Sequence, residues 1–350
     1  MGAPMAYDVV IIGSSFAGLA TAMQLRDYRV LLIDQHPIGA HQMSACATPL
    51  ATARAVGATC ATLATHDALV LHTNGQEVRF PLRNPYITFD YRAFCQAMLA
   101  QTNANVWQAR ATGWSADGVA TTRGTAGARF IVDATGWRAF HAGGAASTPD
   151  LLLVGYGIET ELPLRLDSTP GLHFYVEKRI VRSGYGWVFP CGTATRFGVG
   201  AFAQEPQLRL RLAQFLERYG VRPGATHGGV LAIGRRAPLA GAAFVVGDAA
   251  GQCLPASGEG IRTAIFHGIH CGRAIAAALR GTISADEARA LYCEQVRSTE
   301  GFQGRLLQLQ VLVAATPGPL LAAAGRICSI PALTRGIMRT YLSQSSWFLA

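Results

Sequence analysis

Residues 7–34 read YDVVIIGSSFAGLATAMQLRDYRVLLID, and this stretch decides the fold. Tyr7–Ile12 is rich in β-branched residues and predicts a short strand, and Ala17–Leu25 is an Ala- and Leu-rich stretch suited to a helix. Val30–Ile33 predicts a second buried strand. A strand, a glycine-containing turn, a helix and a second strand within about thirty residues indicate a βαβ unit with parallel strands.

The turn of this unit, Gly13-Ser14-Ser15-Phe16-Ala17-Gly18, keeps the outer two glycines of a GxGxxG fingerprint and has Ser15 in place of the middle one. The middle glycine lets the backbone approach a pyrophosphate, and serine is the next smallest residue that still offers a hydroxyl and a backbone N–H. Asp34 ends the second strand, where a carboxylate can accept hydrogen bonds from an adenosine ribose. We therefore expect a nucleotide-binding turn rather than a purely structural one, with the binding residues Gly13, Ser14, Ser15, Phe16, Ala17, Gly18, Asp34 and Gln35.

Two later glycine motifs extend this pattern. Asp133-Ala134-Thr135-Gly136 follows the apolar residues 130–132, and Gly247-Asp248-Ala249-Ala250-Gly251 follows the apolar residues 244–246. Gly258-Glu259-Gly260-Ile261 then opens a predicted helix that runs to Leu279, and its N-terminal dipole would suit an anionic group of a bound cofactor. Asp248 can hydrogen-bond hydroxyl groups of a bound cofactor, or it is only a helix cap. The additional cofactor-binding residues that we expect are Ala111, Thr135, Gly136, Gly247, Asp248, Pro255, Gly258, Gly260 and Ile261.

Composition predicts a globular chain, since half of its residues are hydrophobic and only 15% are charged. The formal net charge of +9 rests almost wholly on scattered arginines, because Lys178 is the sole lysine. We do not expect nucleic acid as a partner. An ordinary basic surface is the first interpretation, and an acidic electron-donor protein or an anionic lipid surface are the alternatives.

The eight cysteines form no CxxC pair and no zinc-type spacing, so we expect reduced thiols and no metal site. No charged leader or separate apolar segment precedes Tyr7, which favours a cytoplasmic location. Residues 306–327 are apolar but contain Gln308, Gln310, Pro317 and Pro319. They therefore predict an internal or interfacial helical pair rather than a membrane-spanning helix, and peripheral membrane contact stays an alternative.

A second, mainly antiparallel domain is predicted from the strand-rich pattern of residues 151–230. Asn74-Gly75 lies between apolar runs and suits a hairpin turn, so residues 67–82 predict a β-ribbon. Arg92–Gln101 predicts a helix. The return of the strand and helix pattern near residue 244 indicates that the chain comes back to complete the nucleotide domain.

The order of Gly13–Gly18, Asp34, Arg92, Asp133–Gly136 and Gly247–Ile261 resembles a flavoprotein group that includes para-hydroxybenzoate hydroxylase, geranylgeranyl reductases, lycopene cyclases and flavin-dependent halogenases. The resemblance implies FAD as the cofactor. It also implies that Arg92 reaches the FAD phosphates and that the Gly247-Asp248 motif holds the ribityl chain and pyrophosphate.

The fold class that follows is α/β, with a Rossmann-like FAD-binding domain, a mainly antiparallel β-sheet substrate domain interleaved with it, and a helical C-terminus. We assign residues 1–66, 83–145 and 235–284 to the FAD-binding domain, residues 67–82 and 146–234 to the substrate domain, and residues 285–350 to the helical region.

The segment Tyr185-Gly186-Trp187-Val188-Phe189-Pro190 is followed, after seven intervening residues, by Gly198-Val199-Gly200. This pattern is similar to the YxWxFP and GxG signature of geranylgeranyl reductases. Alternation along a strand sends Tyr185, Trp187 and Phe189 to one face. These rings predict a catalytic wall for a flat apolar substrate, and the Tyr185 hydroxyl is a candidate proton donor. An ordinary aromatic sheet core is the alternative.

Cys46 lies in the loop of residues 42–49, shortly after Asp34. The resemblance implies a catalytic cysteine beside the isoalloxazine in this loop, usually followed by a glycine, whereas Ala47-Thr48-Pro49 follows Cys46 here. A small buried residue without a chemical role is the alternative for Cys46.

The leading functional prediction is an FAD-dependent oxidoreductase that reduces carbon–carbon double bonds of a lipophilic isoprenoid or polyene-like substrate by hydride transfer from flavin N5. An FAD-dependent monooxygenase, a non-redox flavin-dependent cyclase and a non-enzymatic flavin-binding protein are the alternatives. A halogenase is disfavoured, since those enzymes use a lysine in the first part of the chain and Lys178 is the first here. With one dinucleotide fingerprint in the sequence, we expect an external reductant, either NAD(P)H or a reduced electron-transfer protein.

Overall fold

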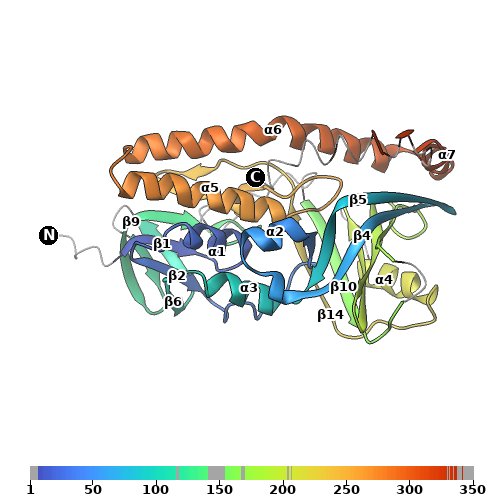
Figure 1. Ribbon diagram of the computed structural model, residues 1–350, viewed down its shortest axis with the longest axis horizontal. Coiled ribbons are helices and arrows are strands. Elements are labelled where there is room, and N and C mark those ends of the chain that lie inside the picture. The colour runs from blue at the N-terminus through green and yellow to red at the C-terminus, as the bar shows by residue number, and fades with distance from the viewer. Residues whose placement is uncertain are drawn as a thin grey trace.

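The computed structural model places two β-sheets side by side along the long axis of the molecule (Figure 1). Two long helices lie on one side of them, and one of these helices extends from the first sheet to the second. Each sheet has eight strands among the residues that the structure describes. The described residues are 7–115, 118–140, 154–166, 170–202, 205, 207–328, 330, 332, 333, 335, 336 and 341.

The first sheet is built around β1 (Tyr7–Ile12), which lies between β2 (Val30–Asp34) and β9 (Gly124–Asp133). Both neighbours run parallel to β1, so the βαβ unit predicted from residues 7–34 is present. The strand order is β15-β16-β9-β1-β2-β6, with the β7–β8 hairpin attached to β9. The remaining strands are β6 (Asn105–Gln108), β7 (Ala111–Ser115), β8 (Gly118–Thr121), β15 (Leu239–Ala240) and β16 (Ala243–Val245).

Helix α1 (Phe16–Met23) follows the glycine turn and packs directly on α5 (Ile261–Leu279). The contact depends on Gly268 and Gly272 of α5, because a Cβ at these positions would lie 2.5 Å from the Ala17 carbonyl oxygen and 2.6 Å from the Thr21 carbonyl oxygen. Residues far apart in the sequence thus complete one unit, as the return of the strand and helix pattern predicted.

The second sheet has the strand order β14-β10-β13-β12-β11-β4-β5-β3, and its pairs are antiparallel except for β11 with β4. The hairpin with its turn at Asn74-Gly75 is present but extends over β4 and β5, well beyond the predicted residues 67–82. The domain boundaries predicted at residues 66/67 and 82/83 therefore fall within β4 and β5. The strands are β3 (Ala47–Pro49), β4 (Thr62–Thr73), β5 (Gln76–Phe89), β10 (Val154–Leu162), β11 (Leu172–Tyr175), β12 (Gly184–Cys191), β13 (Ala194–Ala201) and β14 (Thr226–Ala232).

One face of this second sheet is covered by α4 (Leu208–Glu217). Leu212 and Phe215 of that helix pack with Val188, Phe197 and Val199, which alternate along β12 and β13 with the residues of the opposite face. The opposite face is therefore the one that turns toward the first sheet. The shorter helices elsewhere are α2 (Leu50–Ala55), α3 (Tyr91–Leu99) and the 3-10 turns η1 (Thr59–Ala61) and η4 (Gly247–Ala250).

Helix α6 (Ala285–Ala315) runs beside α5 and continues toward the second sheet, where α7 (Gly318–Cys328) follows (Figure 1). It begins with a capping box in which Ser284 and Glu287 exchange hydrogen bonds. The predicted helical pair is thus present, with its break at Thr316-Pro317. Among the described residues, none of the helices has the length and apolar character needed to cross a membrane.

Candidate functional site

A cavity of about 760 Å³ lies between the two sheets. Its lining combines the glycine turn after β1, the end of β2, the N-terminal end of α5 and the inner face of the second sheet. This volume falls within the range of small-molecule and cofactor sites.

At one end of the cavity, Asp34 is held by the glycine turn. Its Oδ2 accepts hydrogen bonds from the Ser14 backbone N–H at 2.9 Å and from the Ser14 hydroxyl at 2.7 Å, and its Oδ1 accepts from the His36 N–H at 3.0 Å. A carboxylate has further lone pairs on both oxygens. Asp34 is therefore a fixed acceptor that can also receive hydrogen bonds from hydroxyl groups of a ligand.

Two helix N-termini open into the same cavity without a side-chain cap. The N-cap of α1 is Ser15, whose side chain does not cap the helix, and that of α5 is Gly260, which has no side chain. Both residues line the cavity. The Ser15 hydroxyl lies 3.0 Å from the Tyr91 hydroxyl instead. Uncapped N–H groups and the positive end of a helix dipole favour anionic groups.

Between these helix ends lies η4, which brings Gly247 and Asp248 to the cavity. Gly247 has φ of 71°, and a Cβ there would lie 2.9 Å from the Cβ of Ala17. Burial raises the pKa of Asp248 to about 6, although Arg236 acts in the opposite direction. Glycine is needed here because the η4 backbone passes close to α1.

The aromatic wall predicted from the sequence consists of Tyr185, Trp187 and Phe189 on β12, and all three residues line the cavity. The ring centroids are 6.0 Å apart for Tyr185 and Trp187 and 6.4 Å apart for Trp187 and Phe189. Phe174 on β11 packs edge-on against Phe189. These rings make one side of the cavity apolar and rigid.

Trp187 lies flat over glycines of the neighbouring strands. A Cβ at Gly198 of β13 would overlap the indole ring, and a Cβ at Gly200 or Gly157 would lie 3.2 Å or 3.5 Å from it. The glycines of the Gly198-Val199-Gly200 motif therefore have a packing role, since they make space for the tryptophan of the preceding strand.

Next to the aromatic wall, polar residues lie on the neighbouring strands at positions in register with Trp187. Trp187 pairs with Gly198, Gly198 pairs with Glu159 on β10, and Glu159 pairs with His227 on β14. The Trp187 Nε1–H donates to Glu159 Oε2 at 2.6 Å, and Glu159 Oε1 lies 3.0 Å from Nε2 of His227. Glu159 and His227 also line the cavity.

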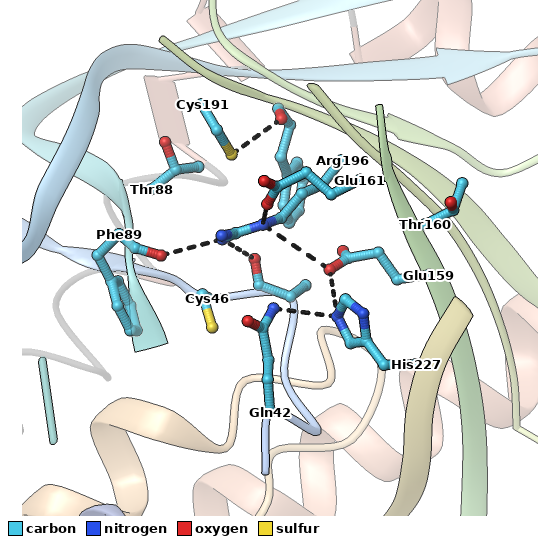
Figure 2. Close-up of polar contacts among 12 residues, drawn as sticks. Gln42, Cys46, Thr88, Phe89, Glu159, Thr160, Glu161, Cys191, Arg196 and His227 are labelled. Atoms are coloured by element: carbon cyan, nitrogen blue, oxygen red, sulfur yellow. Dashed lines mark hydrogen bonds and ion pairs between the residues drawn. The ribbon is translucent and has the colours of Figure 1, made fainter. Parts of the chain in front are cut away.

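Figure 2 shows how Arg196 stands behind this pair. Its Nε donates to Glu161 at 2.7 Å and lies 4.0 Å from Glu159 Oε1, and its Nη1 donates to the Phe89 carbonyl at 3.0 Å. Both Arg196 and Glu159 have side chains that are only 3% exposed. The buried carboxylate of Glu159 is thus compensated by a buried cation and by direct hydrogen bonds.

Two predicted catalytic groups are engaged in hydrogen bonds with the backbone. The Tyr185 hydroxyl donates to the Ser257 carbonyl at 2.7 Å, and burial raises its pKa. Cys46 lines the cavity but is fully buried, its Sγ lies 3.2 Å from the Ser44 carbonyl oxygen, and burial raises the pKa of the thiol well above its ordinary value. Both side chains thus hold their protons tightly at neutral pH.

Most of the residues that the sequence predicts for cofactor binding come together around the cavity. Those that line it are Gly13, Ser14, Ser15, Phe16, Ala17, Asp34, Gln35, Thr135, Gly136, Gly247, Asp248, Gly258, Gly260 and Ile261.

Four of the predicted cofactor residues are absent from the lining: Gly18, Arg92, Ala111 and Pro255. Gly18 packs against the Gly13 carbonyl, and Arg92 is exposed on α3 with its backbone behind Gly39. Sequence reasoning missed Glu159, His227, Gln42 and Arg196. Their proximity depends on strand register and on a loop contact, and no local motif signals either.

Comparisons with solved structures place this arrangement among known folds. The structure superposes on a geranylgeranyl bacteriochlorophyll reductase-like protein from Thermoplasma acidophilum with a TM-score of 0.85. The match covers 97% of this chain and 96% of that protein, at 17% sequence identity. A probable FAD-dependent monooxygenase from Pseudomonas aeruginosa matches with a TM-score of 0.66 at 17% identity, over 95% of this chain and 99% of the other. The chain has the fold of these flavoproteins.

A flavin-dependent brominase matches the same flavoprotein fold with a TM-score of 0.67 at 15% identity, over 96% of this chain and 98% of the other. No protein-family model and no curated protein sequence matches the chain. The predicted fold class, α/β with a Rossmann-type unit and a second sheet, is confirmed.

Proposed function

We propose that the chain binds FAD non-covalently in the cavity between its sheets. One observation carries this proposal. The same cavity is lined by the Asp34 carboxylate, which can accept hydrogen bonds from a ribose, by two uncapped helix N-termini and by the aromatic wall. The end at Asp34 fits an adenosine ribose, and the α1 N-terminus fits a pyrophosphate. The α5 N-terminus fits the anionic edge of a reduced flavin.

The cavity continues beyond the proposed flavin position to Tyr185, Trp187 and Phe189. We propose that an apolar substrate lies against these rings. The residues of the wall would orient the substrate and exclude water, and the carboxylate of Asp34 would hold the far end of the cofactor. When bound, the flavin supplies the redox chemistry.

The reaction that we propose is reduction of a carbon–carbon double bond in a lipophilic, isoprenoid or polyene-like substrate. Two observations support it. The first is the aromatic wall, whose Trp187 packs on Gly198 and Gly200, and the second is the TM-score of 0.85 with a protein described as geranylgeranyl bacteriochlorophyll reductase-like. The external reductant is proposed to be NAD(P)H or a reduced electron-transfer protein, and the basic surface suits an acidic donor protein or an anionic lipid surface.

A monooxygenase is the second candidate, supported by the similarity to the probable FAD-dependent monooxygenase. A flavin-dependent cyclase remains the non-redox alternative. A halogenase is disfavoured, because Lys178, the sole lysine, donates to the carbonyls of Val313 and Ala314 near the end of α6 and does not line the cavity.

The test of the proposed function is anaerobic. Protein reconstituted with FAD is reduced with dithionite and then mixed with prenyl lipids and aromatic polyenes, and flavin absorbance is followed. Reoxidation by an alkene without oxygen, with a product two hydrogens heavier, supports the reductase. Product formation only after oxygen is admitted supports the monooxygenase, and a product of unchanged mass supports the cyclase. Protein that fails to bind added FAD would remove the basis of all three.

A further inference from the structure

Glu159 and His227 are a buried acid and an imidazole whose contact is fixed by direct pairing between β10 and β14. His227 Nε2 lies 3.0 Å from Glu159 Oε1 and also 3.0 Å from Nε2 of Gln42. The Gln42 amide in turn donates to the Ser44 carbonyl at 3.1 Å. The ring of His227 is therefore held at one nitrogen by groups from two directions.

These contacts limit where protons can lie. If Nε2 of His227 carries a proton, it donates to ionised Glu159. If Nε2 is unprotonated, its single lone pair accepts the proton of a protonated Glu159, and the Gln42 amide then donates to the Ser44 carbonyl. A proton therefore lies between Glu159 and His227 in both arrangements. The other ring nitrogen, Nδ1, makes no hydrogen bond with any described residue, which leaves it available to a ligand.

The pair lies among several charged and titratable groups. Arg196 on β13 faces Glu159 and binds Glu161, and Cys46 and Cys191 approach the same cation. Burial raises the pKa of both thiols, to about 11 for Cys191, so neither thiol adds a negative charge at neutral pH. The charges nearest to His227 are thus the Glu159 carboxylate and, behind it, Arg196.

We propose that His227, oriented by Glu159, is the proton donor of the alkene reduction; this inference rests on the proposed function. One alkene carbon receives the hydride that the reduced flavin supplies, and the other receives the Nδ1 proton of His227. Two new C–H bonds replace the π bond, and both electrons arrive with the hydride. Glu159 balances the charge by passing its proton to Nε2 or by stabilising the imidazolium beforehand, and water reprotonates the pair.

The geometry favours this pair over the candidate donor Tyr185 and over the predicted catalytic residue Cys46. The proton of Tyr185 is directed at the Ser257 carbonyl, and the thiol of Cys46 is buried against the Ser44 carbonyl. The Glu159–His227 pair is also tied to the substrate wall, since Glu159 accepts the indole N–H of Trp187. A substrate seated on Trp187 therefore lies beside the donor.

A first experiment observes the pair without turnover. Proton NMR of the FAD-free protein, with ¹⁵N-labelled histidine, should show a downfield ring N–H signal from His227 hydrogen-bonded to the carboxylate. The signal should vanish in His227→Asn and move upfield in Glu159→Gln. A signal that Glu159→Gln leaves in place would overturn the pairing.

A second experiment measures anaerobic reoxidation of reduced flavin by an alkene that the wild type accepts, across the pH range. The rate should fall as pH rises, because the donor must be protonated. His227→Asn should lower the rate about 100-fold and remove that pH dependence, whereas FAD binding stays unchanged. Glu159→Gln should give a smaller loss with an altered pH profile.

The matched control is His72→Asn. His72 lies on β4 of the same sheet, bonds His173 at 2.9 Å and does not line the cavity, so its loss should leave rate and pH profile unchanged. If the wild type reduces no alkene, the proposed function fails. If the wild type reduces an alkene and His227→Asn, with FAD bound, keeps the wild-type rate and profile, only the proton-donor assignment fails.

Discussion

The indole N–H of Trp187 donates a 2.6 Å hydrogen bond to the buried carboxylate of Glu159, across the strand that holds Gly198. The apolar wall and the polar pair of the cavity are thus one packed unit. Gly198 makes the contact possible, because any side chain at that position would occupy the space of the indole ring.

Gly198→Ala should displace the indole and break its bond to Glu159. Overpacking of this kind costs about 1–3 kcal/mol of folding free energy. Intrinsic tryptophan fluorescence and chemical denaturation would measure both effects, with alkene turnover as the functional readout. Gly113→Ala is the control, since a Cβ at Gly113 meets nothing within 4 Å. Equal stability and emission in the Gly198 and Gly113 variants would contradict the packing role.

Trp187→Phe and Trp187→Ala separate two roles of the same side chain. Phenylalanine keeps much of the aromatic surface but leaves Glu159 without its indole donor, whereas alanine removes both. Turnover should fall in both variants and further in Trp187→Ala, with FAD affinity changed little. Titration with FAD beside steady-state kinetics would check this. A loss of FAD binding with normal turnover per bound flavin would argue against a substrate wall.

Asp34→Ala should weaken FAD binding about 10- to 100-fold, because hydrogen bonds to a charged group contribute about 1.5–3 kcal/mol each. Calorimetric titration of FAD into the apoprotein measures the change. Asp67→Ala, on the exposed hairpin, is the control for loss of a carboxylate. Affinities that match in the wild type and both variants would remove Asp34 from the cofactor site.

Asp248 should make the FAD-free protein less stable as pH rises. Burial raises its pKa from 3.8 to about 6 in the folded state, so between these values the folded chain binds more protons than the unfolded chain. The stability present below pH 3.8 is therefore lost as pH rises through about 6, by about 2–3 kcal/mol. Denaturation of the wild type and Asp248→Asn from pH 4 to pH 7 would test this. Parallel curves for the two proteins would contradict it.

Cys46 should resist alkylation in the folded protein, because its thiol is buried and its pKa is raised. Cys60 is exposed and should react with iodoacetamide first. Peptide mass spectrometry after brief labelling at neutral pH distinguishes the two thiols. Early labelling of Cys46 would mean that the loop opens in solution and would restore a chemical role for the thiolate.

How much of this structure the sequence predicts depends on how far apart along the chain the interacting residues lie. The βαβ unit and the Tyr185–Phe189 wall depend on alternation and turn residues within one segment, and both are present. Glu159 and His227 are 68 residues apart, and their contact depends on strand order and register, which local pattern does not encode. The prediction that Arg92 reaches the FAD phosphates rests on resemblance alone, and the Arg92 side chain lies on the surface of α3 outside the cavity.

The crossing of α1 and α5 at Gly268 and Gly272 has a consequence for ligand choice. The two helices touch along their backbones, so the separation of their N-termini is set by the fold and does not adjust to the ligand. A cofactor must match that fixed length to engage both ends at once. FMN, which lacks the adenosine half, would engage only one of them, and the chain should therefore discriminate between flavins by molecular length.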